Sequence, residues 1–90
     1  MAGYKTAEQI FTQACAHSET DTGQRRFINK EFRNLDDSDM WPIHNRFNVT
    51  ERAIRHARKF EKDSDVMSPY EYALFLEQET SRIVNDSNNW

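Results

Sequence analysis

The chain has 90 residues, of which 37% are hydrophobic and 30% are charged, and its formal net charge is −3. This length suits a single domain over residues 1–90 with a modest core, and it disfavours a deep substrate cavity. Two Gly and two Pro residues disfavour all-β and coil-rich folds, and a single Cys excludes an internal disulfide. The N-terminus lacks a signal-peptide pattern and no apolar run could span a bilayer, so we expect a cytoplasmic protein without membrane contact.

The first predicted helix runs from Ala7 to about His17. Thr6 and Gln9 have the spacing of a capping box, in which each side chain satisfies a free backbone N–H. Five apolar or small residues follow at helical spacing: Ala7, Ile10, Phe11, Ala14 and Cys15. Because a free Cys on an apolar arc behaves as a small hydrophobe, we expect a buried thiol that reacts slowly in the native state.

The second predicted helix covers Thr22–Asn34, with Asp21 as its N-cap and Gln24 three residues later. Its apolar arc consists of Phe27, Ile28, Phe32 and Leu35. The opposite arc carries the basic residues Arg26, Lys30 and Arg33. This separation is typical of an amphipathic helix on a domain surface.

A connector over residues 35–47 follows, and Pro42 biases Trp41 away from helical geometry. The connector is longer than the two to eight residues or so that usually join helices in a bundle. It also contains four large apolar residues, Met40, Trp41, Ile43 and Phe47. These side chains either fill the core or contact a partner.

The third predicted helix covers Val49–Lys62, with Asn48 or Thr50 as its N-cap. One face carries Val49, Ala53, Ile54, Ala57 and Phe60 and is expected to be buried. The opposite face carries Arg52, Arg55, His56, Lys59 and Lys62. Glu51 precedes Arg55 by four residues, a spacing that favours an ion pair on an ordinary exposed helix.

The fourth predicted helix has the clearest start, with Ser68 as N-cap, Pro69 at the first helical position and Glu71 completing a capping box. Met67 is placed to pack on Tyr72. The core face is expected to contain Tyr72, Ala73, Leu76, Ile83 and Val84. Leu74 and Phe75 point away from this face, and Trp90 ends a polar tail.

The sequence offers little for catalysis. Cys15 could form a thiol–imidazole pair only with His17, His44 or His56, and no phosphate-binding loop or nucleophile elbow is present. Cys15 and His17 would lie on different faces of one helix, which disfavours a zinc site. We therefore expect no enzyme activity, no metal and no cofactor.

The basic residues allow three interpretations: a solvated face, a surface for a protein partner, or a surface for nucleic acid. Clustered Lys and Arg residues suit phosphate binding, and the first two helices have a helix-turn-helix outline. The sequence pI near 5.5 is far below the value above about 9 that is usual for nucleic-acid-binding domains. Residues 61–90 carry a net charge of −5, which disfavours a phosphate backbone nearby.

The predicted fold is all-α, a compact four-helix domain with a long apolar connector between its second and third helices. The predicted function is a non-catalytic protein-binding module, and nucleic-acid binding is the alternative. The expected partner-binding residues are Arg26, Lys30, Arg33, Trp41, Arg52, Arg55, His56, Lys59, Lys62, Phe75 and Trp90. In type only, the chain is similar to phage and mobile-element accessory proteins that block host complexes such as CRISPR–Cas effectors. A homodimer stays open as a further alternative.

Overall fold

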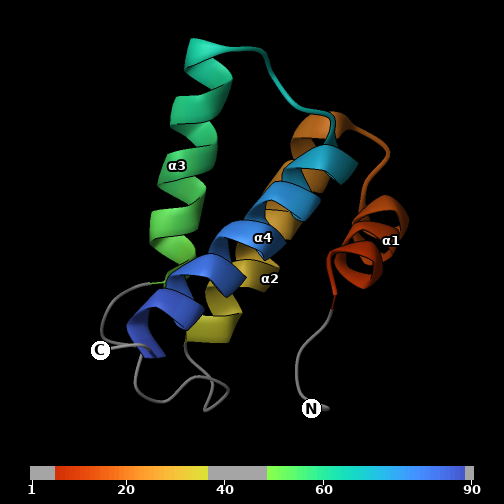
Figure 1. Ribbon diagram of the computed structural model, residues 1–90. Helices are drawn as coiled ribbons and strands as arrows, with labels where there is room; N and C mark the ends of the chain where they lie inside the picture. Colours follow the sequence, from red (N-terminus) through yellow and green to blue (C-terminus); the bar gives the residue numbers. More distant parts are fainter. Residues whose placement is uncertain (1–5, 37–48, 89–90) are drawn as a thin grey trace.

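Four helices make up most of the part of the chain that the computed structural model describes, residues 6–36 and 49–88 (Figure 1). They are α1 (Ala7–His17), α2 (Asp21–Asp36), α3 (Val49–Asp63) and α4 (Pro69–Asn88). These described ranges contain no strand, so the predicted all-α class is confirmed. The predicted start of the connector was wrong, because residues 35 and 36 belong to α2; the rest of the connector, with Trp41, and the C-terminal Trp90 lie outside the described residues.

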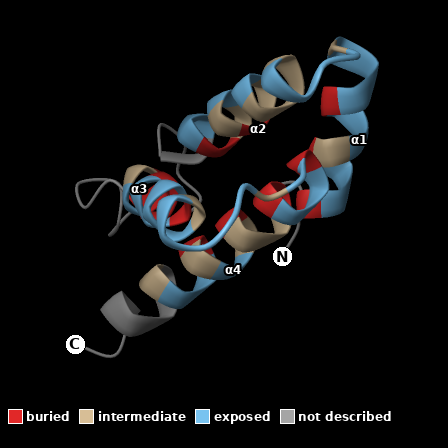
Figure 2. Ribbon diagram, turned by 90° about the horizontal axis from the view of Figure 1, so that it is seen from above, coloured by how far each residue is buried: buried red, intermediate tan, exposed pale blue. Residues whose placement is uncertain are grey.

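The helices pack around one core to which all four contribute. α1 and α3 lie on opposite sides of the molecule, with α2 and α4 between them (Figures 1 and 2). The buried side chains lie on the faces that the helices turn toward one another (Figure 2). The main core cluster consists of Ala7, Ile10, Ala14, Ile28, Phe32, Ala53, Ile54, Ala57, Tyr72, Ala73 and Leu76.

The predicted start of α1 is confirmed. Thr6 Oγ1 accepts a hydrogen bond from the Gln9 backbone N–H at 3.3 Å, and the Thr6 N–H donates to Gln9 Oε1 at 2.9 Å. The Ala7 N–H, which has no acceptor within its own helix, donates to Glu77 Oε2 of α4 at 2.8 Å. The first turn of α1 is therefore anchored to α4.

The predicted cap of α2 was wrong. Asp21 is the first helical residue, and the Thr20 hydroxyl accepts the Gly23 N–H at 3.0 Å. Gln24 does not close a capping box on Asp21 but donates from Nε2 to the Ser18 carbonyl at 3.0 Å. The turn is tight, because a Cβ at Gly23 would lie 2.1 Å from Ser18 Oγ.

In α3, Val49, Ala53, Ile54 and Ala57 are buried as predicted. The proposal of Thr50 as a cap was wrong, because this residue lies within the helix and is completely buried. Asn48, the other proposed cap, lies outside the described residues.

The prediction that Phe60 belongs to the core was also wrong, since 42% of this residue is exposed. At 100° per residue Phe60 lies between Val49 and Ala53, inside the buried arc, so the helical period alone does not account for its exposure. It turns toward α4, where its ring centroid lies 5.3 Å from that of Phe75.

The predicted capping box of α4 is confirmed. The Glu71 N–H donates to Ser68 Oγ at 3.3 Å, and the Ser68 N–H donates to Glu71 Oε1 at 3.3 Å. Tyr72, Ala73 and Leu76 are buried as predicted, whereas Ile83 is only half-buried. Leu74, Phe75 and Met67 are partly buried against the core, and the side chain of Val84 lies outside what the structure describes.

Replacing the cap as Ser68→Ala is expected to lower the free energy of unfolding by about 1 kcal/mol, because the first turn of α4 loses its acceptor. The measurement is the midpoint of chemical denaturation. Ser81→Ala, at an exposed position inside α4, is the control and should cause no loss. Equal midpoints for the Ser68 variant and the wild type would contradict the role of this cap.

Candidate interaction surface

The outward face of α3 carries a line of cations that we call the α3 basic stripe: Arg52, Arg55, Lys59 and Lys62. All four residues are exposed, while Ala53, Ile54 and Ala57 of the same helix are buried. With a rise of 1.5 Å per residue the stripe is roughly 15 Å long. The sequence prediction of an exposed basic face is therefore confirmed for these four residues.

Three members of the stripe have no partner in the described part of the protein. Arg55, Lys59 and Lys62 make neither a side-chain hydrogen bond nor an ion pair with any described residue. The predicted pair between Glu51 and Arg55 is absent there. Instead, Glu51 Oε1 accepts from Arg33 Nε of α2 at 2.6 Å.

Arg33 is a weaker candidate for partner binding than the stripe, because its ion pair with Glu51 of α3 partly neutralises its charge. Both side chains are well exposed, at 45% and 36%, so the pair contributes little to stability. Arg33 thus has a local acidic partner, unlike the three unpaired cations of the stripe.

His56 also differs from the stripe, since it faces α4. Its Nδ1 lies 2.5 Å from Glu79 Oε1, and Arg82 Nη2 donates to the same oxygen at 2.9 Å. The hydrogen bond from Arg82 is the main cause of a lowered Glu79 pKa, and the bond with His56 adds to it against the opposing effect of burial. The stabilisation from Glu79 is therefore present above its ordinary pKa and is lost as the pH falls through the lowered value.

Beside the stripe lies an aromatic patch made of His56, Phe60 and Phe75. The Phe75 ring centroid lies 5.3 Å from that of Phe60 and 5.4 Å from that of His56. Phe60 is one of the few large hydrophobic residues that are exposed in the described chain. Phe residues are among the aromatic residues that are enriched in the cores of protein interfaces.

The α2 cations Arg26 and Lys30 are exposed, as predicted, and have no hydrogen-bond or ion-pair partner among the described residues. They line a hollow together with His17 and Ser18 at the end of α1. The helix that carries the stripe, α3, lies on the other side of the molecule from α1 (Figure 1). The predicted basic residues therefore lie on two separate parts of the surface, one at the hollow beside α1 and one on α3.

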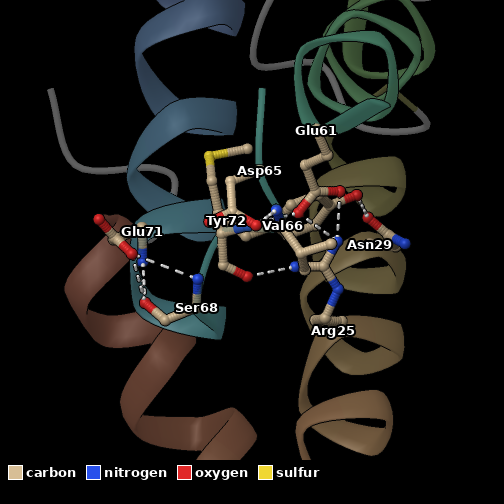
Figure 3. Close-up of polar contacts among 9 residues, drawn as sticks. Arg25, Asn29, Glu61, Asp65, Val66, Ser68, Glu71 and Tyr72 are labelled. Atoms are coloured by element: carbon tan, nitrogen blue, oxygen red, sulfur yellow. Dashed lines mark hydrogen bonds and ion pairs between the residues drawn. The ribbon is translucent and has the colours of Figure 1, made fainter. Parts of the chain in front are cut away.

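The sequence analysis missed a partly buried polar cluster that joins α2, α3 and α4 (Figure 3). Arg25 Nη2 of α2 donates to both carboxylate oxygens of Glu61 in α3, at 2.5 and 2.7 Å. Arg25 Nη1 donates to the Met67 carbonyl at 2.8 Å, and the Met67 N–H donates to Glu61 Oε2 at 2.9 Å. This cluster fixes α2, α3 and the α3–α4 linker together.

Tyr72 of α4 completes the cluster. The Arg25 guanidinium carbon lies 4.2 Å from the Tyr72 ring centroid, and the Tyr72 hydroxyl donates to Asn29 Oδ1 at 2.5 Å. Burial raises the pKa of Tyr72 above its ordinary value, against the opposing charge of Arg25. The neutral phenol is therefore a stabilising group whose contribution is lost as the pH rises through that raised pKa.

The prediction that Cys15 is buried was wrong, because the residue is exposed. Ala7, Ile10 and Ala14 form the buried arc of α1, and Cys15 lies roughly 105° from its middle at 100° per residue. We now expect a thiol reagent to label the native protein about as fast as the denatured protein. Slow native labelling that accelerates in denaturant would contradict this exposure.

The described residues hold no group of three His, Cys, Asp or Glu side chains placed to bind a metal. Nor does that part of the chain contain a helix with the length and apolar character needed to cross a membrane. Comparison with protein families, curated proteins and solved structures finds no match for this chain.

Proposed function

We propose that the protein is a small non-catalytic binding module whose α3 basic stripe contacts an acidic surface of a protein partner. The observation that carries this proposal is a row of three cations on one exposed helix face, Arg55, Lys59 and Lys62, which have no partner among the described residues. Cations without an internal partner are available to steer association with an acidic surface.

The aromatic patch supplies the second element of such an interface. Phe60 is 42% exposed and rests on Phe75, so a partner that covers it gains apolar burial without reorganising the core. His56 is held by Glu79, which keeps the edge of the patch ordered. In this proposal the patch anchors the partner and the stripe guides its approach.

Nucleic-acid binding is the second candidate function. Arg26 and Lys30 of α2 favour it, because they have no partner in the described part of the chain and add to the positive charge available for phosphates. Against it stand the pI near 5.5 and the net charge of −5 in residues 61–90. A more specific proposal is that the protein comes from a phage or mobile element and blocks a CRISPR–Cas effector; it rests only on analogy with proteins of this type. Self-association through the same face is a further proposal.

The test is capture of partners from a nuclease-treated host lysate. The wild type is compared with a reversed-stripe variant that combines Arg55→Glu, Lys59→Glu and Lys62→Glu. The reversed stripe is expected to lose the partner that the wild type retains, and with the purified partner to slow association by roughly tenfold. Phe60→Ala is expected to speed dissociation instead. The matched control, Arg26→Glu with Lys30→Glu, should leave both rates unchanged.

A fluorescence-anisotropy titration with duplex DNA and with RNA at about 150 mM salt separates the two functions. Binding tighter than the roughly 10⁻⁴–10⁻⁶ M of non-specific contact, abolished by reversing the stripe, would refute the protein-partner proposal in favour of nucleic acid.

A further inference from the structure

A hollow of about 370 Å³ lies where the end of α1 meets the first turns of α2. This volume lies within the range of roughly 300–1,000 Å³ for small-molecule sites. Arg26 and Lys30, one helical turn apart, lie in its wall, and neither has a partner among the described residues. The lining also contains the Glu31 carboxylate, so the two cations leave it with a net positive charge that favours an anionic ligand.

The same hollow has an aromatic wall. The ring centroids of His17 and Phe27 lie 5.0 Å apart with an interplanar angle of 36°. His17 belongs to the exposed residues, so a flat group could lie against it. Gly23 lets the α1–α2 turn approach α2, since a Cβ there would lie 2.1 Å from Ser18 Oγ.

We propose that this hollow binds a phosphate monoester carried on an aromatic group, with the phosphate against Arg26 and Lys30 and the ring against His17 and Phe27. A phosphate monoester carries a charge of about −1.5 to −2 at pH 7 and offers three strong acceptor oxygens, which matches two adjacent cationic donors. This site is independent of the α3 basic stripe and of the partner proposed for it.

The test is an NMR titration of the isotopically labelled full chain with phenyl phosphate. The largest shift changes are expected at the lining residues His17, Ser18, Gly23, Arg26, Phe27 and Lys30. Arg26→Gln and Lys30→Gln should each weaken binding by about tenfold, as the loss of one charge-assisted hydrogen bond predicts. Glu31→Gln should tighten binding, because Glu31 is an acidic residue of the lining.

The α3 stripe provides a matched control. Arg55 and Lys59 are the same residue types at the same four-residue spacing and are equally unpaired, and neither lines the hollow. Arg55→Gln and Lys59→Gln should leave phenyl phosphate binding unchanged. Equal weakening by both pairs would mean attraction by overall charge and would overturn the proposal.

Four further ligands test which parts of the ligand the hollow recognises. Phenyl sulfate, a monoanion, and inorganic phosphate, which lacks the ring, are both expected to bind more weakly, and equal affinity of either would overturn the proposal. Adenosine 5′-monophosphate and phosphotyrosine distinguish a nucleotide from a modified side chain, and tighter binding of one identifies the source. If both bind no better than inorganic phosphate, the aromatic part of the proposal is wrong.

Discussion

Glu61→Gln is expected to lower the free energy of unfolding by about 3 kcal/mol, because it leaves the Arg25 guanidinium without its counter-charge in a largely buried place. Only 9% of the Glu61 side chain and 22% of the Arg25 side chain are exposed. The substitution keeps the volume of the side chain, so the loss reports the charge and not a cavity. Urea denaturation followed by circular dichroism measures it.

The control is a second Arg–Glu pair between the same two helices. Glu51→Gln breaks the Arg33–Glu51 pair, whose side chains are 45% and 36% exposed, and should cost less than about 1 kcal/mol. Equal losses of unfolding free energy in Glu61→Gln and Glu51→Gln would contradict the conclusion that the less exposed pair matters more for stability. Arg25→Gln combined with Glu61→Gln should cost less than the sum of the single changes, because neither charge is then left unpaired.

Leu76→Ala is expected to cost about 3 kcal/mol, since Leu76 is completely buried in the core and truncation leaves a cavity among packed helices. A domain of this size has a total stability of roughly 5–13 kcal/mol, so the variant should show a clearly lower denaturation midpoint. The measurement is the same urea titration.

The control for this core substitution is Val66→Ala in the α3–α4 linker, where 71% of the residue is exposed. The change removes apolar atoms that already contact water, and it should alter stability by no more than about 0.5 kcal/mol. A loss at Val66 as large as that at Leu76 would mean that the linker packs more tightly than its exposure indicates.

The sequence by itself determined the helices and two of their starts. Capping boxes are local, because Thr6 with Gln9 and Ser68 with Glu71 satisfy backbone groups only three residues away. The sequence also predicted which side of α3 faces solvent, because the helical period separates Arg55 and Lys59 from the buried residues. Local spacing and the 3.6-residue period are sufficient for features of this kind.

Only the tertiary structure decided which polar groups are paired and how each helix is rotated. Arg25 and Glu61 are 36 residues apart, and their pairing follows from the packing of α2 on α3, which no local pattern encodes. Cys15 lies at the edge of an apolar arc, where a small rotation of the helix decides between core and solvent. Phe60 is 42% exposed although the helical period places it among the buried residues of α3. The sequence predicted the stripe but not that Arg55, Lys59 and Lys62 have no partner among the described residues. Glu51 could have paired with Arg55 of its own helix, and the fold pairs it with Arg33 of α2 instead.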